Sequence, residues 1–317
     1  MKALHEPAPV DISVVIPVFN EEESLPGLFD RLFPVMEKLD SHWEVLFIND
    51  GSRDRSLALL LSCLDKHPDK VRVIDFNGNF GQHMAIVAGF SLSRGETVIT
   101  MDADLQNPPE EIPRLIHAVE EGHDVVGTIR KARRDPFFRK IVSRLANIAT
   151  NRITGLKLHD YGCMFRAYNR RVVNLINSCP ETTTFIPALA QKFAMNPAEI
   201  EVQHSQREKG TSKYGIFRLV RLNFDLMTGF SLMPLQAVTM LGVTIAGLSL
   251  FFSLYMLMRR LFIGPEAEGL FTLMTINFFL IGVTMFCVGI TGEYTGRIYQ
   301  EVRKRPRYVI RKVYGDE

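Results

Sequence analysis

The feature that most constrains this chain is a pair of long uncharged runs, Leu226–Met258 and Gly269–Gly292. A helix needs about 20 consecutive apolar residues to cross a bilayer, and both runs exceed that length. Residues 226–292 carry four charges, and all four lie between the runs: Arg259, Arg260, Glu266 and Glu268. The sequence therefore predicts a transmembrane hairpin, with spans at about 235–258 and 269–292.

Basic residues flank the hairpin on one side of the predicted membrane. They are Lys213, Arg218 and Arg221 before it, and Arg297, Arg303, Lys304, Arg305, Arg307, Arg311 and Lys312 after it. Because lysine and arginine gather on the cytoplasmic side, we expect both ends of the chain in the cytoplasm and a small external loop. The opening residues MKALHEPAPVD are polar and give no sign of a signal peptide.

Net charge and cysteine usage exclude some classes of protein. The formal net charge of +2 gives no polyanion signature, so we expect no nucleic-acid partner. The four cysteines, Cys63, Cys163, Cys179 and Cys287, have no metal-binding spacing and read as reduced thiols.

The part before the hairpin alternates short β-branched runs with helical patterns. Strands are predicted at 12–18, 43–50, 71–76, 96–102 and 124–130. This alternation is typical of an α/β domain with a mainly parallel, Rossmann-like sheet covered on both faces, here over residues 1–213. Ligands of such sheets bind at the carboxyl ends of the strands. The sequence contains neither a GxGxxG nor a P-loop motif.

Two basic amphipathic segments, 136–153 and 214–233, combine arginines with apolar residues at helical spacing. Each is predicted either to lie at the membrane interface or, alternatively, to pack as an ordinary surface helix. The second would be a juxtamembrane helix that leads into the hairpin of 234–292. Residues 293–317 would then form a basic cytoplasmic tail.

The stretch VITMDADLQNPPEE, residues 98–111, runs a buried strand into two aspartates. Residues two apart on an extended chain point to the same side, so Asp102 and Asp104 would share a face. Neighbouring carboxylates repel each other unless they are solvated, protonated or bridged by a cation. The residues alone leave open a solvated acidic turn and a divalent-cation site.

The motifs, taken together, resemble the family-2 glycosyltransferases of the GT-A fold. They are VVIPVFNEEESL, INDGSRDRS, NFGQHMAIVAGF, MDADLQNPPEEI, VVGTIR, FFRKIVSRLAN, YGCMFRAYNRR and QREKGTSKY. Their order is most similar to that of the polyprenyl-phosphate glycosyltransferases, and within these to the enzymes that use 4-deoxy-4-formamido-L-arabinose. The resemblance covers nearly the whole chain, including the hairpin.

The resemblance implies a donor site for a UDP-sugar. Asp102, Asp104 and Gln106 would hold Mg²⁺ or Mn²⁺, which suits their hard oxygen ligands. The nucleotide-sugar would contact Pro17, Val18, Asn20, Glu21, Asp50, Asp102, Arg207 and Lys213. Turn chemistry alone is the competing interpretation of the Asn, Asp, Gly and Ser residues in these loops, and simple solvation is the competing interpretation of Arg207 and Lys213.

The acceptor implied by the resemblance is undecaprenyl phosphate, bound through Arg130, Arg139 and Ser143. A phosphate monoester is already ionised at neutral pH, so its attack needs positioning more than a general base. Asp160 would therefore act either as a base or as an orienting partner of Arg166. The local sequence is DYGCMFR, where many relatives carry a SGFR-type segment, so the resemblance is weakest there.

The implied activity is inverting, metal-dependent transfer of a sugar from UDP to undecaprenyl phosphate. It would take place at the bacterial inner membrane, as a homo-oligomer and by resemblance a tetramer, for lipid A modification and polymyxin resistance. Glucose, N-acetylglucosamine and mannose remain alternative sugars, and a non-catalytic sugar-nucleotide scaffold is the alternative of another class. A processive synthase needs a QxxRW motif. The single tryptophan, Trp43, lies on an early strand, so the sequence does not contain that motif.

Overall fold

The structure is a computed structural model that describes residues 9–130, 163–179, 185–202, 232–262, 270–303 and 305–315. The chain divides into two compact units. The first comprises Met1–Asn151, Leu156–Lys213 and Arg305–Glu317, and the second comprises Arg152–Gly155 and Tyr214–Lys304. Residues 305–317 of the predicted tail thus group with the first unit, and residues 293–304 group with the second.

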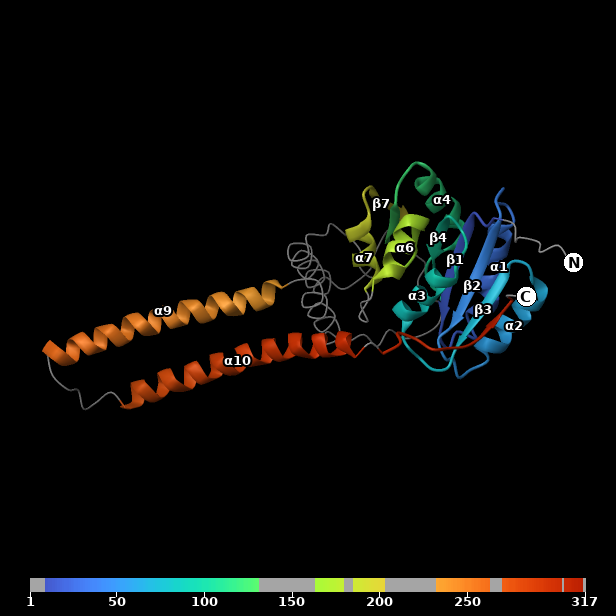
Figure 1. Cartoon of the computed structure of the whole chain (residues 1–317). Coiled ribbons are helices and arrows are strands. Elements are labelled where there is room, and N and C mark those ends of the chain that lie inside the picture. The colour runs from blue at the N-terminus through green and yellow to red at the C-terminus, as the bar shows by residue number, and fades with distance from the viewer. Residues whose placement is uncertain are drawn as a thin grey trace, which may run out of the picture. The chain divides into compact units, whose positions relative to one another are not determined.

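The first unit is built on one eight-stranded sheet (Figure 1). Its strands are β1 (Ile12–Val18), β2 (Trp43–Asn49), β3 (Val71–Phe76), β4 (Thr97–Thr100), β5 (Val125–Arg130), β6 (Arg166–Asn169), β7 (Pro197–Val202) and β8 (Ile310–Tyr314). The described helices are α1 (Leu25–Met36), α2 (Ser56–Lys66), α3 (Gln82–Leu92), the short 3₁₀ helix η1 (Pro109–Glu111), α4 (Ile112–Glu120), α6 (Arg170–Ser178) and α7 (Ile186–Phe193). The five predicted strands are confirmed, with ends that differ by at most two residues at β4.

The strand order is β7-β5-β6-β4-β1-β2-β3-β8. Strand β1 pairs in parallel with both β2 and β4. The chain adds β2 and β3 on one side of β1 and then β4 on its other side, so the strand order reverses between β1 and β4. Strand β6 runs antiparallel between β4 and β5, and β8 runs antiparallel beside β3. The sheet is therefore mixed, and its central block, β4-β1-β2-β3, is parallel as predicted.

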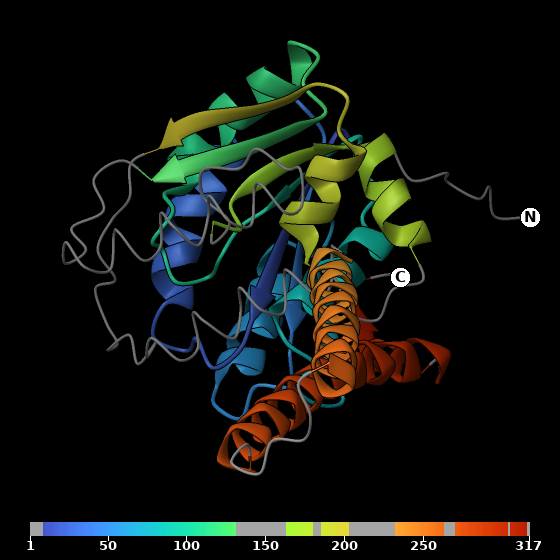
Figure 2. The same ribbon diagram turned by 90° about the vertical axis from the view of Figure 1, so that its left-hand side faces the viewer.

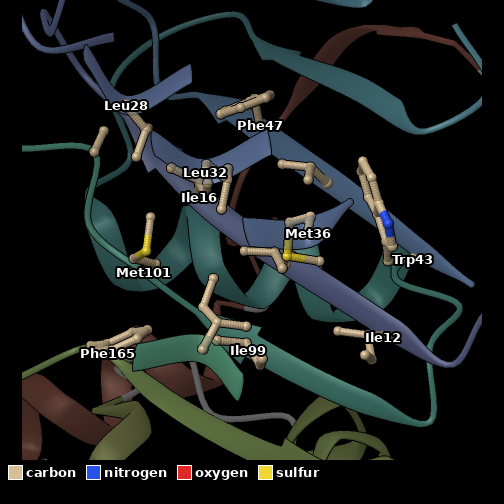
Figure 3. Packing of buried hydrophobic residues seen from close by; sticks show 14 of the residues in the cluster. Ile12, Ile16, Leu28, Leu32, Met36, Trp43, Phe47, Ile99, Met101 and Phe165 are labelled. Carbon is tan, nitrogen blue, oxygen red and sulfur yellow. The ribbon is translucent and has the colours of Figure 1, made fainter. Parts of the chain in front are cut away.

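The pleat of β1 divides its side chains between two helical layers. Ile12, Val14 and Ile16 belong to the main apolar core, which also contains Leu28 and Leu32 of α1 (Figure 3). Val15 faces the other layer, where a Cβ added at Gly89 of α3 would lie 2.2 Å from Val15 Cγ1. Helices α6 and α7 lie on the α3 side of the sheet (Figure 2). Both faces are covered, which explains the continuous apolar runs of the strands.

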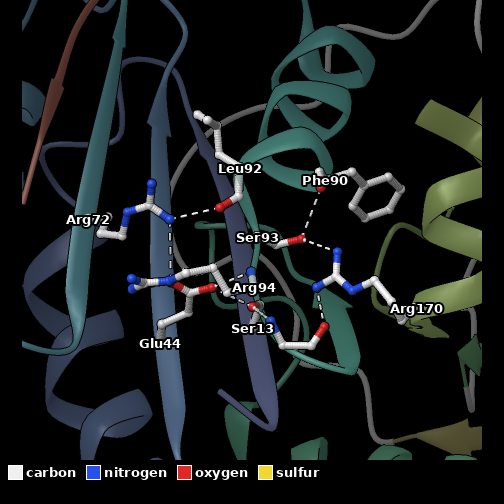
Figure 4. Close-up of polar contacts among 9 residues, drawn as sticks. Ser13, Glu44, Arg72, Phe90, Leu92, Ser93, Arg94 and Arg170 are labelled. Carbon is white, nitrogen blue, oxygen red and sulfur yellow. Dashed lines mark hydrogen bonds and ion pairs between the residues drawn. The ribbon is translucent and has the colours of Figure 1, made fainter. Parts of the chain in front are cut away.

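A charged cluster is buried at the amino ends of the parallel strands (Figure 4). Glu44 of β2, whose side chain is 1% exposed, accepts hydrogen bonds from Ser13 Oγ at 2.6 Å and from Arg94 Nη2 at 2.9 Å. The buried Arg72 of β3 lies 3.4 Å from the same carboxylate and donates to Leu92 O at 2.7 Å. We call Ser13, Glu44, Arg72 and Arg94 the amino-end cluster. The Glu44 carboxylate thus meets two arginines, which compensates for the burial of its charge.

The strand β8 closes the β3 edge of the sheet. Asn77 donates its backbone N–H to Val309 O at 3.1 Å, and the ring of Tyr308 stacks on Phe76 with centroids 5.2 Å apart. Gly315 has a φ of +87°, and a Cβ there would lie 2.8 Å from Val71 O, so this turn favours glycine. These contacts tie residues 308–315 to the sheet, and the sequence analysis had not predicted the strand.

The second unit contains two long helices, α9 (Met233–Phe262) and α10 (Leu270–Val302). Both are long and apolar enough to cross a bilayer, over Pro234–Phe252 and Ile276–Val302. Large apolar side chains such as Phe251 and Phe278 are more than 70% exposed in them. Helix α10 continues ten residues beyond the predicted end of its span at residue 292, and Glu293 pairs with Arg297 in this extension. The predicted interfacial segments 136–153 and 214–233 lie outside the described residues, except for Leu232 and Met233 at the start of α9.

Candidate active site

The loops after β1 and β2 are joined by hydrogen bonds at the carboxyl edge of the sheet. Asn20 adopts a left-handed φ of +55°, which asparagine tolerates better than most residues. Its backbone N–H donates to Ser52 Oγ at 3.1 Å, and its Oδ1 accepts the N–H of Arg53 at 2.8 Å. Glu21 donates its N–H to Ser56 Oγ at 2.9 Å. The Asn20 side chain therefore holds the second loop in place.

Asp50 lies directly after β2 and is 3% exposed. Its Oδ1 accepts the N–H of Phe80 at 2.7 Å, and its Oδ2 accepts the N–H of Gly81 at 2.9 Å. Burial raises the pKa of the Asp50 carboxyl, and the two backbone N–H groups oppose that rise. In the structure Asp50 fixes the loop after β3; its contact with a nucleotide stays a prediction.

Gln82 connects this loop to the aspartate pair. It begins α3, next to the residues that Asp50 holds, and its Nε2 donates to Asp102 Oδ1 at 2.5 Å. The motif NFGQHMAIVAGF was part of the resemblance, but no role was predicted for Gln82. Its position directly after Gly81, where a helical pattern begins, was the available signal. The ends of β2, β3 and β4 are thus linked through Asp50, Gln82 and Asp102.

The segment after β4 carries Asp102, Asp104 and Gln106, all half-buried. Met101 and Ala103, which precede the two aspartates, are buried. This alternation matches the expectation that the two aspartates lie on one side of the chain. The N–H of Gln106 donates to Asp104 Oδ1 at 3.1 Å, which closes a tight turn around Leu105 with its left-handed φ of +59°. The three predicted metal ligands therefore lie together in one turn.

Prolines follow this turn at the start of the next helical segment. Pro109 begins η1, and α4 follows η1 directly. Arg31 of α1 contacts Glu110 through Nε at 3.0 Å and Nη2 at 2.8 Å, so a bidentate ion pair holds the start of η1 against α1. The turn that contains the aspartates is thereby fixed at both of its ends.

The remaining site residues of the sequence analysis divide into two groups. Pro17 and Val18 end β1, and Arg130 is the last residue of β5, at the same edge of the sheet as Asp102. Asp160, Arg139, Ser143, Arg207 and Lys213 lie outside the described residues. Arg166, the proposed partner of Asp160, is buried in β6, where its Nε donates to Cys163 O at 2.9 Å.

A cavity of about 390 Å³ opens at the carboxyl ends of β1, β2 and β3, and the aspartate turn is not part of its lining. Asn20, Asn49, Gly51, Ser52, Arg53, Asp75, Asn77, Gly78, Asn79 and Arg311 line it together with Phe19 and Leu57. Gly51 has a φ of +68°, and a Cβ there would lie 2.5 Å from the carbonyl carbon of Gly78. The absence of a side chain at Gly51 thus lets the two loops that form the cavity approach each other.

The donor set at the aspartates fits a divalent cation that also binds a ligand. Among the described residues no group of three His, Cys, Asp or Glu side chains is close enough together to hold a metal ion. Magnesium in nucleotide sites is typically held by one or two carboxylates, with phosphate oxygens and water completing the shell. Two carboxylates and an amide in one half-buried turn provide that partial shell.

This arrangement defines a class of protein: an α/β domain that binds a nucleoside-diphosphate sugar at the point where the strand order reverses, the GT-A fold. A solved structure of glucosyl-3-phosphoglycerate synthase from Mycobacterium tuberculosis, in complex with Mn²⁺, UDP and phosphoglyceric acid, shares this fold. Its TM-score is 0.52 at 17% identity, over 70% of this chain and 77% of that chain.

The chain belongs to glycosyl transferase family 2, whose family model matches residues 13–176. It is 47% identical to the undecaprenyl-phosphate 4-deoxy-4-formamido-L-arabinose transferase of Yersinia pestis strain Pestoides F, over 99% of this chain and 97% of that protein. The protein of the same name from Yersinia pseudotuberculosis strain YPIII matches at the same identity and coverage. The protein is therefore a glycosyltransferase, and the likeness extends through both long helices.

Proposed function

We propose that this glycosyltransferase moves 4-deoxy-4-formamido-L-arabinose from UDP to undecaprenyl phosphate. The observation that carries the proposal is the 47% identity, over 99% of the chain, to transferases named for that sugar and that acceptor. The aspartate turn, and a polar cavity at the same edge of the sheet, support the proposal. Modification of lipid A, and with it resistance to polymyxin, is the proposed consequence.

The aspartate turn would hold the metal ion through Asp102, Asp104 and Gln106. A divalent cation, Mg²⁺ or Mn²⁺, would neutralise the charge that develops on the departing diphosphate. The protein's own part is orientation: Gln82 holds Asp102, and the N–H of Gln106 holds Asp104. Such prior alignment lowers the cost of binding the charged leaving group at the moment of reaction.

The acceptor phosphate would approach from the β5 side of the aspartate turn. Arg130 ends β5 at that edge of the sheet, and Arg139 and Ser143 follow it in sequence. An arginine fork matches phosphate geometry, and the phosphate oxygen is already anionic when it attacks. Arg207 and Lys213 would contact the donor diphosphate. Asp160 would orient the acceptor side rather than remove a proton.

The long helices would place this reaction at a membrane surface. We propose that α9 and α10 cross the bacterial inner membrane, with both ends of the chain in the cytoplasm. The basic residues outside the helices favour that orientation. The acceptor carries a long isoprenoid chain, so a site tethered to the bilayer meets it where it resides. Assembly as a homo-oligomer, by resemblance a tetramer, is part of the same proposal.

The test is product identification with the full-length protein in detergent or in lipid nanodiscs. The protein is incubated with undecaprenyl phosphate and UDP-linked 4-deoxy-4-formamido-L-arabinose, glucose, N-acetylglucosamine or mannose, each with Mg²⁺, Mn²⁺ or a chelator. Mass spectrometry should detect the lipid-linked formamido sugar only when a metal ion is present. A lipid product from another sugar alone would overturn the proposed specificity, and full turnover in chelator would overturn the metal role.

A further inference from the structure

One wall of the cavity comes from a strand that lies far from the others in sequence. Arg311 of β8 lines the cavity opposite residues of the loops after β1, β2 and β3. Strand β8 begins at Ile310, shortly after α10 ends at Val302. Strand β8 therefore contributes a positively charged side chain to the edge of the sheet at which the donor is expected.

Contacts within the sheet fix the Arg311 side chain. Its Nη1 lies 3.3 Å from Asp75 Oδ2, and the Asp75 side chain is 2% exposed. Asp75 also accepts a hydrogen bond from Asn49 Nδ2 at 2.7 Å. The Arg311 side chain is nevertheless 59% exposed, so only part of its guanidinium is occupied by this buried carboxylate. A guanidinium has five N–H donors, which leaves several to face a ligand.

The position of the cavity along the sheet indicates which part of a donor it receives. The aspartate turn follows β4, and the cavity lies over the ends of β1, β2 and β3. Neighbouring strands are about 4.8 Å apart, so β2 lies about 10 Å from β4. A nucleoside diphosphate whose phosphates meet the aspartates would reach the cavity with its nucleoside end. Asparagine side chains and the Arg311 guanidinium offer donors for the carbonyl oxygens of a pyrimidine base.

We propose that Arg311, held by Asp75, binds the nucleoside end of the sugar nucleotide and so makes β8 part of the donor site. This inference rests on the proposed function, because it takes the donor to be a uridine nucleotide. Arg311 acts through hydrogen bonds to, or stacking against, the base, and both modes need the planar guanidinium. It does not contact the reacting atoms, so it sets donor affinity and leaves the chemical step unchanged.

The experiment measures the affinity of full-length protein for UDP, UMP and uridine by competition against labelled UDP. Arg311→Ala should weaken all three ligands by a similar factor of about tenfold, as expected for loss of a hydrogen bond to a charged group. In turnover, the KM for the UDP-sugar should rise by the same factor while kcat stays constant. Lys312→Ala is the matched control, because Lys312 lies over the ring of Tyr314 and does not line the cavity. It should leave every affinity unchanged.

Three results would overturn the inference. Unchanged affinity in Arg311→Ala, while the wild-type protein binds UDP, would remove Arg311 from the site and leave the proposed function standing. If Arg311→Ala weakened the affinity for UDP but not for uridine, Arg311 would lie at the phosphates instead. If the wild-type protein failed to bind UDP, the proposed donor itself would be wrong, and the inference would fall with it.

A second variant guards against a folding defect. Arg311→Lys keeps the charge beside Asp75 but lacks the planar fork. It should retain the thermal midpoint of the wild-type protein and still lose several-fold affinity for uridine. Wild-type affinity in Arg311→Lys would show that charge alone suffices and would overturn the proposed recognition by the guanidinium.

Discussion

The two ends of the parallel strands hold their charges in different ways. At the amino ends, Glu44 lies among Arg72, Arg94 and Ser13, so its negative charge meets positive charge within the protein. At the carboxyl ends, the contacts of the aspartates include neutral donors: the backbone N–H groups of Phe80 and Gly81 at Asp50, the Gln82 amide at Asp102 and the Gln106 N–H at Asp104, whereas the buried Asp75 meets the partly exposed Arg311.

This difference separates a structural cluster from a site for a ligand. A carboxylate paired with a buried arginine has little capacity left for a cation. If one partner of the pair is lost, the other remains as a buried charge without compensation. A neutral donor orients a carboxylate without cancelling its charge. The proposal is that Asp102 and Asp104 at the carboxyl edge bind a cation, whereas the amino-end cluster holds strands together.

The largest expected effect comes from removing one charge at the carboxyl edge. Asp104→Asn should lower the rate of sugar transfer by at least about 10³-fold, equivalent to about 4 kcal/mol, because a metal ligand supplies several kcal/mol of charge stabilisation. Initial rates with saturating UDP-sugar and metal measure this loss. The thermal midpoint should stay within about two degrees of the wild-type value.

Glu110→Gln is the control for that variant. Glu110 lies just beyond the same turn but pairs with Arg31 on the surface. Transfer should remain within about twofold of wild type, since exposed ion pairs contribute less than about 1 kcal/mol. Equal activity losses in the two variants would mean that the turn responds to any charge change, and Asp104 would have no special part.

The reverse result is expected at the amino edge. Glu44→Gln should destabilise the first unit by roughly 3 kcal/mol, because Arg72 would remain buried without a carboxylate. Thermal and denaturant unfolding measure the change. The kcat of the protein that remains folded should match wild type. A stable Glu44→Gln variant with impaired kcat would contradict the division between the two edges.

The smallest expected effect is a pH dependence at the carboxyl edge. His83 follows Gln82 in α3 and its ring packs against Phe185. Desolvation lowers the pKa of His83 from 6.5 to about 4. The unfolded chain therefore binds more protons between these pH values, and stability should fall as the pH falls below 6.5, by up to about 1 kcal/mol for the first pH unit.

His83→Gln tests this origin of the pH dependence. The variant should lose the wild-type slope of unfolding free energy between pH 6.5 and 5.5, while Glu44→Gln should keep it. Denaturant unfolding at fixed ionic strength gives both slopes. The same slope in wild type and His83→Gln would assign the titration to another group.

The sequence predicted the parallel centre of the sheet because its strands are buried on both faces. Val14, Val15 and Ile16 of β1 show this continuous apolar pattern, and it needs no knowledge of distant residues. Strands β6, β7 and β8 were not predicted. RAYN of β6 is largely buried but only four residues long, and IRKVY of β8 has two adjacent basic residues that were interpreted as a membrane flank.

The site was predictable where the chemistry is local and not where it depends on long-range contacts. Asp102, Asp104 and Gln106 form a motif that can be found along the chain. Gln82 and Arg311 reach the site through the loop after β3 and through a strand at the other end of the sequence. Glu44 likewise shows no sign of its partners in sequence, because Arg72 and Arg94 join it only when the sheet has formed.

The placement of β8 sets an order for biosynthesis. The ribosome makes β3 early, but it delivers the strand that covers the open edge of β3 only after both helices of the hairpin have emerged. Until then, β3 presents free backbone groups of the kind that invite aberrant pairing with other chains. Synthesis of both helices must therefore precede completion of the sheet, and a nascent chain stalled in the hairpin would carry an unfinished sheet.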